Sequence, residues 1–353
     1  MLSRLQVRDF RCFESGEIAL HPETTILVGQ NAQGKTSLIE AVCVLMRLQS
    51  PRTSARNDFI RFGAKACVIE AQLGATRLRF GQSTVNRRLA VDDAICGRVG
   101  DYLRSTARVV WLDHSDMNLT RGHAEHRRRY LDFAAAQLFP EYLPALKSYE
   151  RALRSRNFLL KRDAIVAWAQ VDAYGAQLAV HARVLFACRR ELIERLHPYV
   201  CAAHAHVSGM AELAELSYLP GCSGDDMEQE LRANRSEEER LRSTVIGLHR
   251  DDLRLAIDGR EAGVFASEGQ QRTLCLAMKL AQARVLEQGR GEPPLLLMDD
   301  IFGELDKRRR GALLSFLPQH AQKIITTTFI DWADEAALGG AVWEVNAGKL
   351  KLL

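Results

Sequence analysis

The chain has 353 residues, 47% hydrophobic and 26% charged, which is the composition of a globular protein long enough for two or three domains. Its formal net charge of +4 is small, so any nucleic-acid surface must come from an uneven distribution of basic residues. The sequence has no membrane-length apolar run, no secretory signal and no C-x-x-C pair among its eight cysteines, which predicts a cytoplasmic protein with reduced thiols and no membrane contact.

Strands are predicted at residues 5–8, 17–20 and 25–28. The third strand leads into a P-loop of the pattern G-x-x-x-x-G-K-[ST], which a helix over residues 36–48 follows. Glycines at the loop ends let the backbone wrap round phosphate oxygens, while the lysine is expected at the β- and γ-phosphates and the threonine on Mg²⁺. The candidate ATP-binding residues are Gly29, Gln30, Asn31, Ala32, Gln33, Gly34, Lys35 and Thr36.

The middle of the chain changes from strands to long helices. A basic loop at residues 51–58 is either a solvated connection or a contact with phosphate or DNA. An antiparallel meander is predicted at residues 68–73, 77–80 and 85–89, and another strand at 109–112. Helices are predicted at residues 123–138, 141–161, 164–205 and 226–242.

Residues 120–162 hold ten basic and four acidic side chains, an excess larger than the net charge of the whole chain. Aromatic residues lie among these basic side chains, a combination typical of nucleic-acid surfaces, although a charged helical face can also be simply solvated. The candidate DNA contacts are Arg127, Arg128, Arg129, Arg151, Arg154 and Arg156.

A second acidic motif completes the nucleotide site. Four apolar residues at 295–298 predict a buried strand that ends in Asp299 and Asp300, which is the Walker B arrangement. We expect Asp299 to join Thr36 in the Mg²⁺ shell and Asp300 to position or deprotonate the attacking water. The alternative, a helix cap after the strand, explains one acid better than two.

The separation of the two motifs predicts the domain organisation. Thr36 and Asp299 lie 299 − 36 = 263 positions apart, so a large insertion must separate two halves of one nucleotide-binding head. We therefore predict an ATPase lobe from residues 1–119 and 244–353, with a helical lobe inserted at residues 120–243.

Another anion receptor is predicted at residues 267–271, where Ser267 and Gly269 open a long helix and Gln270 follows. Because the chain already has P-loop amides, a second receptor makes sense if it binds the nucleotide of another subunit. The alternative is an ordinary helix that Ser267 caps.

Together these motifs resemble the ABC-type ATPases of the SMC/RecF/RecN group, most closely the RecF family, over nearly the whole chain. The resemblance rests on several segments in the family's order: residues 5–11 (LQVRDFR), 29–41, 127–132 (RRRYLD), 247–253 (GLHRDDL), 267–274 (SEGQQRTL) and 299–306. It implies an α/β fold, an ABC/SMC-type P-loop ATPase head with an inserted helical lobe.

The resemblance also implies a function. Members of this group are expected to form ATP-dependent homodimers, to bind single-stranded, gapped or linear duplex DNA, and to hydrolyse ATP weakly as a DNA-stimulated switch. It implies work with RecO and RecR in recombinase loading and SOS induction. By the same resemblance Ser267 and Gly269 face the partner's γ-phosphate, Asp306 lies at the dimer interface, and Thr327 or Thr328 takes the switch position, with Thr328 as the catalytic candidate.

Two departures from the family pattern bear on ATP binding. Ala32 stands where the family usually has glycine, and binding is expected to survive if the φ angle of Ala32 is negative. Glu268 brings a negative charge close to the proposed phosphate receptor.

Three other functions fit the sequence less well. The basic insert favours DNA over the ATPase subunit of a transporter. No acidic metal cluster follows residue 300, which argues against a fused nuclease of the overcoming-lysogenisation type. Intact Lys35, Thr36, Asp299 and Asp300 argue against a non-hydrolysing binding module.

Overall fold

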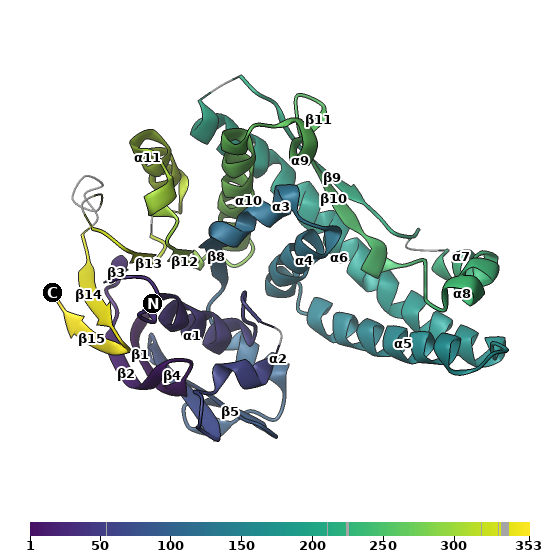
Figure 1. Cartoon of the computed structure of the whole chain (residues 1–353), viewed down its shortest axis with the longest axis horizontal. Helices are drawn as coiled ribbons and strands as arrows, with labels where there is room; N and C mark the ends of the chain where they lie inside the picture. Colours follow the sequence, from purple (N-terminus) through teal and green to yellow (C-terminus); the bar gives the residue numbers. More distant parts are fainter. Residues whose placement is uncertain (54, 210, 224–225, 319, 331, 333–338) are drawn as a thin grey trace. The chain divides into compact units, whose positions relative to one another are not determined.

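The computed structural model describes residues 1–53, 55–209, 211–223, 226–318, 320–330, 332 and 339–353. The chain divides into two compact units, of which the first combines Met1–Asp116 with Leu286–Leu353 and the second is Met117–Val285. The first unit is therefore built from both ends of the chain, and the second is inserted into it (Figure 1).

A largely parallel sheet carries both nucleotide motifs in the first unit. Its strand order is β15-β14-β3-β13-β12-β8, and every neighbouring pair is parallel except β14 with β15. The strands are β3 (Thr24–Val28), β8 (Val109–Asp113), β12 (Leu295–Asp299), β13 (Lys323–Thr327), β14 (Ala341–Asn346) and β15 (Lys349–Leu352). The apolar runs of β3, β8 and β12 are buried, as expected for parallel strands covered on both faces.

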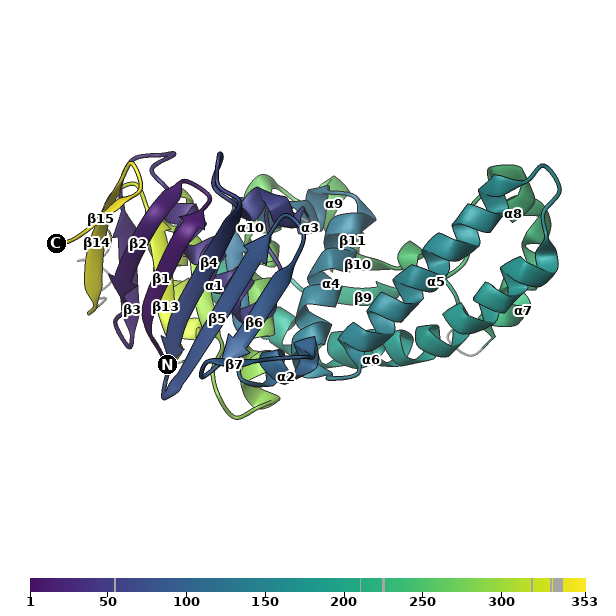
Figure 2. The same ribbon diagram turned by 90° about the horizontal axis from the view of Figure 1, so that it is seen from below.

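The second sheet of this unit is antiparallel, in the order β2-β1-β4-β5-β6-β7, and Figure 2 shows its strands side by side. They are β1 (Leu2–Phe10), β2 (Phe13–Ala19), β4 (Ala66–Leu73), β5 (Thr76–Ser83), β6 (Arg87–Val91) and β7 (Ala94–Ile95). The predicted meander of residues 68–89 is confirmed by the pairing of β4, β5 and β6.

Helix α1 (Lys35–Arg47) contacts strands of both sheets, including β12 and β13 on one side and β1 and β4 on the other. This position explains why almost all of its residues are buried. Two shorter helices belong to the same unit, α2 (Val99–Arg104) and α11 (Lys307–Phe316).

The second unit is mostly helical, with α5 packed against α6 (Figure 2). Its helices are α3 (Asn118–Arg121), α4 (Ala124–Leu138), α5 (Tyr142–Arg162), α6 (Trp168–Ser208), α7 (Met227–Ala233), α8 (Arg235–Leu241), α9 (Ala262–Phe265) and α10 (Glu268–Gln288), whose last residues belong to the first unit. A small antiparallel sheet has the order β11-β10-β9, formed by β9 (Ala214–Leu219), β10 (Asp252–Ile257) and β11 (Arg260–Glu261).

The structure differs from the sequence expectation in two places. Residues 226–242 were predicted as one helix, but they form α7 and α8, which break at Asn234. Residues 244–285, which we assigned to the second half of the ATPase lobe, lie in the second compact unit. None of the helices in the described ranges is both long enough and apolar enough to cross a membrane.

Candidate functional site

The P-loop joins the carboxyl end of β3 to the first turn of α1. Gly34 caps α1 with a φ of 109°, and a Cβ at this position would come within 2.8 Å of the Cys12 Sγ. A Cβ at Gly29 would lie 2.3 Å from the carbonyl oxygen of Val345. Both glycines are therefore required by close packing of the loop, in addition to its conformation.

Ala32 has a φ of 64°, in the left-handed region. From the sequence we expect ATP binding to survive if the φ of Ala32 is negative, and this condition is not met. A left-handed alanine costs about 1 kcal/mol because its Cβ crowds the following carbonyl oxygen. The loop keeps a backbone conformation that glycine would adopt without this cost.

Lys35 lies over its own loop, where its Nζ donates to the carbonyl oxygens of Gly29 at 2.7 Å and Gln30 at 2.8 Å. Burial lowers the pKa of Lys35, and the charges of Asp300 and Asp299 act in the opposite direction. Gln33 fixes the other side of the loop, since its Oε1 accepts from the backbone N–H of Ala347 at 2.6 Å.

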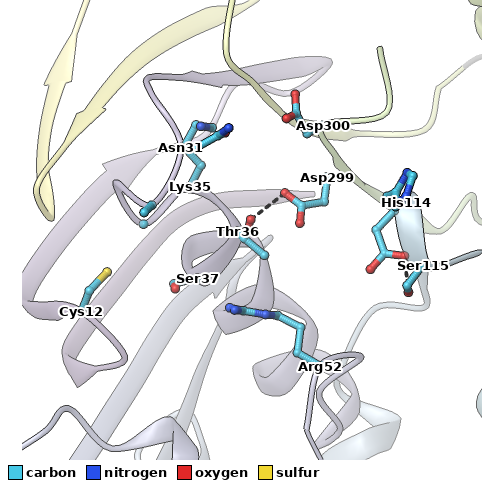
Figure 3. Close-up of a pocket in the computed structure, with 13 residues that line it drawn as sticks. Cys12, Asn31, Lys35, Thr36, Ser37, Arg52, His114, Ser115, Asp299 and Asp300 are labelled. Carbon is cyan, nitrogen blue, oxygen red and sulfur yellow. Dashed lines mark hydrogen bonds between the residues drawn. The ribbon is translucent and has the colours of Figure 1, made fainter. Parts of the chain in front are cut away.

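Asp299 meets the P-loop helix directly. Its Oδ1 accepts from the Thr36 hydroxyl at 2.8 Å and from the Thr326 hydroxyl at 2.6 Å (Figure 3 shows the first of these bonds). Burial raises the pKa of Asp299, the two hydroxyls lower it, and the nearby carboxylate of Asp113 raises it further. The side chains of the two motifs are thus brought together across 263 positions of sequence.

A pocket of about 480 Å³ opens over these groups. Its walls include seven predicted residues, of which Asn31, Ala32, Gly34, Lys35 and Thr36 come from the P-loop and Asp299 and Asp300 from the Walker B motif (Figure 3). Arg52 of the basic loop at residues 51–58 also lines it, as do polar and charged residues that were not among the candidates, namely Cys12, Ser37, Asp113, His114 and Ser115.

Arg52, from the basic loop after α1, is oriented by a buried acid. The Glu40 carboxylate on α1 is fully buried and pairs with Arg52 at 3.3 Å and with Arg11 at 2.5 Å. One part of the predicted 51–58 loop therefore reaches the nucleotide pocket.

Thr326, which contacts both Walker B acids, is another residue of this site that sequence reasoning missed. Its hydroxyl donates to Asp299 and accepts from the backbone N–H of Asp300 at 3.0 Å. Thr327 is buried and donates to the Phe329 carbonyl oxygen, whereas Thr328 is exposed beyond the end of β13 and does not line the pocket. The catalytic role of Thr328 stays a prediction.

In the second unit, Ser267 caps α10. Its Oγ accepts from the backbone N–H of Gln270 at 3.3 Å, and its own N–H donates to Gln270 Oε1 at 2.7 Å. Glu268 lies 3.9 Å from Arg121 and 3.6 Å from Arg272, so its negative charge has basic neighbours. The capping alternative is thus realised in this chain, and it leaves Ser267 exposed.

Asp306 in the first unit is also a helix cap. Its carboxylate accepts from the backbone N–H of Arg309 at 2.8 Å at the start of α11. Its side chain is 56% exposed, so it stays accessible to a second subunit. The interface role predicted for it remains untested.

Two of the six candidate DNA contacts are engaged inside the protein. Arg156 is fully buried, and its guanidinium binds the equally buried Glu238 through two hydrogen bonds of 2.8 and 2.6 Å. Arg127 forms a two-point pair with Asp252 at 2.6 and 2.9 Å, with a side chain that is 13% exposed. We therefore remove Arg156 and Arg127 from the DNA contacts, because their charges organise the second unit.

The other four candidates differ in how exposed they are and in which groups they contact. Arg128 is half-buried and donates to the Asp251 carbonyl oxygen at 2.8 Å. Arg129 pairs with Glu125 on the surface, and Arg154 lies 3.9 Å from Glu150. Arg151 is exposed. Exposed ion pairs of this kind are weak, so Arg129, Arg151 and Arg154 remain accessible to an external phosphate.

The fold and the site define a class: a P-loop ATPase head whose P-loop and Walker B strands come from opposite ends of one chain. The family described as RecF/RecN/SMC N terminal domain matches residues 1–337. A protein of Synechococcus sp. (strain JA-2-3B'a(2-13)) called DNA replication and repair protein RecF is 37% identical, over 99% of this chain and 97% of its own. The protein of that name from Symbiobacterium thermophilum is 36% identical, over 94% and 92%. The chain belongs to the RecF family.

Solved structures agree with this fold. The recombination mediator protein RecF-ATPrS in the RecFOR pathway is 24% identical with a TM-score of 0.89, covering 100% of this chain and 98% of its own. An Smc head bound to the C-winged helix domain of ScpA is 14% identical with a TM-score of 0.57, covering 100% and 96%. The predicted fold class, an ABC/SMC-type head with an inserted helical lobe, is confirmed.

Proposed function

We propose that this protein is an ATP-dependent DNA-binding protein of DNA replication and recombinational repair, located in the cytoplasm. One observation carries the ATP-binding part: Thr36 of the P-loop helix and Asp299 of the Walker B strand share a hydrogen bond of 2.8 Å beside Lys35. The names of relatives at 36–37% identity over most of the chain support the assignment to replication and repair.

The residues present fit Mg²⁺ and ATP. The Thr36 hydroxyl and the Asp299 carboxylate are in contact, and oxygen groups of this kind are the ligands that Mg²⁺ prefers. Because Asp299 is buried, a bound cation would stabilise its negative charge. Thr36 and Asp299 would hold the ion, which neutralises charge on the β- and γ-phosphates when bound. Lys35 and the P-loop amides would bind the phosphates, with Lys35 leaving its two carbonyl partners.

Slow hydrolysis then serves as a switch. Asp300 lines the pocket next to Asp299 and is the group placed to accept a proton from water. Thr328 is proposed as a contributor from the end of β13. We propose a weak ATPase that DNA stimulates and that resets the protein to its nucleotide-free state.

The complete site needs a second copy of the chain. Ser267, Gly269 and Gln270 at the start of α10 are proposed to contact the nucleotide of the partner, and Asp306 to lie at the interface. Amides at a helix start attract anions because the helix dipole places partial positive charge there. ATP therefore drives homodimerisation in this proposal.

DNA binding is the activity that we propose for the dimer. Arg129, Arg151 and Arg154 are accessible basic residues of the helical insert, to which the half-buried Arg128 adds. The dimer is proposed to bind single-strand gaps, linear duplex and single-stranded DNA. RecO and RecR are the proposed partners in recombinase loading and SOS induction, in line with the pathway named for the structural relative.

Fluorescence anisotropy on gapped, duplex and single-stranded DNA tests this function, with ATP-Mg²⁺, with ADP and with no nucleotide, at two salt concentrations. We expect ATP to strengthen binding and salt to weaken it. Lys35→Met should remove the ATP effect. Equal DNA affinity with and without ATP in the wild type would contradict the proposal.

A further inference from the structure

The proposed partner-facing receptor is closed by a side chain of its own helix. The Ser267 N–H donates to Gln270 Oε1 at 2.7 Å, and the Ser267 Oγ accepts from the Gln270 N–H at 3.3 Å. The N–H and the hydroxyl of Ser267 are the groups that would bind the phosphate of the partner's nucleotide. An incoming anion must therefore displace the Gln270 side chain from the Ser267 N–H.

Gln270 is held in this closed position by a residue from another element. Its Nε2 donates to Glu212 Oε1 at 2.9 Å, and Glu212 lies between α6 and β9 with a side chain that is 13% exposed. The next residue is anchored, since Leu213 and Asp258 exchange two hydrogen bonds of 2.9 Å. The amide of Gln270 is thus fixed at both ends, by Ser267 and by Glu212.

A buried histidine lies behind Glu212. His204 on α6 is fully buried, and neither ring nitrogen has a hydrogen-bond partner among the described residues. Its Nε2 lies 3.7 Å from Glu212 Oε2, which also lacks a partner there. Burial lowers the pKa of His204, against the charges of Glu212 and Asp258. A separation of 3.7 Å is too long for a hydrogen bond, so Gln270 is the hydrogen-bond donor that the described residues give to the Glu212 carboxylate.

We propose that Glu212 is a positioning residue that latches Gln270 over Ser267 and so sets the ATP concentration at which the protein dimerises. The inference rests on the proposed function, because it concerns the same receptor. Opening the latch leaves the carboxylate of Glu212 without its hydrogen bond, so the closed form predominates in the free protein. The apparent affinity for the partner's nucleotide is therefore the affinity of the open form multiplied by the fraction of molecules that are open.

Three variants separate the latch from general packing. Glu212→Leu removes the acceptor at similar size, whereas Glu212→Gln keeps a carbonyl oxygen that can accept from Gln270. Glu215→Leu is the matched control, since Glu215 lies on β9 and pairs with Arg254 at 3.5 Å. None of these positions belongs to the proposed nucleotide-binding machinery.

Amide hydrogen exchange at Ser267 without nucleotide tests the contact. We expect Glu212→Leu to speed this exchange about tenfold, and Glu212→Gln and Glu215→Leu to match the wild type. Unchanged exchange in Glu212→Leu would overturn the proposal. Circular dichroism and thermal unfolding confirm that each variant is folded.

Sedimentation across an ATP titration tests the consequence. The ATP concentration for half-maximal dimerisation should fall about tenfold in Glu212→Leu and stay at the wild-type value in the other two. If the wild type dimerises and Glu212→Leu needs as much ATP or more, the latch is refuted while the proposed function stands. If the wild type stays monomeric at saturating ATP, the proposed function fails and the latch with it.

Discussion

Replacing Thr326 with valine removes one hydroxyl from the nucleotide site without changing the shape of the strand. Thr326 is fully buried on β13, and valine is also β-branched and of similar volume. The Asp300 N–H keeps its second acceptor, the Thr326 carbonyl oxygen at 3.2 Å. The substitution therefore removes the 2.6 Å bond to Asp299 and leaves the backbone pairing in place.

The magnitude follows from the charge of the acceptor. Without this bond Asp299 is no longer held in the position that faces Thr36, and ordering it again on Mg²⁺ costs as much as a hydrogen bond to a carboxylate contributes, about 1.5–3 kcal/mol. At about 1.4 kcal/mol per factor of ten, the variant should need about 10 to 150 times more Mg²⁺ for half-maximal nucleotide binding. Losing a donor also raises the pKa of Asp299 further, so Mg²⁺-dependent binding should fail at a higher pH than in the wild type as the solution is acidified.

Fluorescent-nucleotide binding across an Mg²⁺ titration measures this effect. Thr25→Val is the control, because Thr25 is a buried threonine near the start of neighbouring β3, where its hydroxyl accepts from the His21 N–H at 2.9 Å. The control should bind Mg²⁺-nucleotide like the wild type. A Thr326→Val midpoint within twofold of the wild type would refute the reasoning that this hydroxyl supports Asp299.

Four further outcomes are expected. Because burial raises the pKa of Asp299, its ionisation costs stability that is present at low pH and lost as pH rises through the folded-state pKa, so Asp299→Asn should raise the Tm of the nucleotide-free protein at neutral pH and not in acid. Glu238→Ala leaves the Arg156 charge buried without its partner, and thermal unfolding should show a loss of about 3–5 kcal/mol. The exposed Cys12 thiol lines the pocket, and bound ATP should slow its alkylation, as peptide mapping would show. Ala32→Gly should add about 1 kcal/mol of stability in a denaturant titration, since it relieves a left-handed alanine.

Some features of the site could be predicted from the sequence because they follow from local constraints. The glycine pattern of the P-loop and the apolar strand before Asp299 identify two strand ends, and parallel strands bring such ends to one edge of a sheet. Thr326 was missed because threonines occupy positions 326 to 328, and only the register of β13 against β12 shows that Thr326 faces Asp299. Register depends on contacts that a local pattern does not contain.

The candidate DNA-binding arginines show the same difference between what a local pattern predicts and what depends on distant residues. Arg156 lies on the buried stripe of α5 with Tyr149, Ala152 and Leu159, a spacing of three and four residues that the sequence already contained. The periodicity could therefore have excluded it as a DNA contact. Arg127 could not have been excluded in this way, because its partner Asp252 is 125 positions away.

Sedimentation velocity with and without ATP-Mg²⁺ tests the central claim most directly, on the wild type, Lys35→Met and Ser267→Arg. Lys35→Met removes the cation expected at the phosphates, and Ser267→Arg fills the proposed receptor with a bulky side chain. The account predicts that ATP converts the wild type to a dimer and that both variants stay monomeric. A wild type that binds ATP and remains monomeric would contradict it, and Ser267 would then be only the cap of α10.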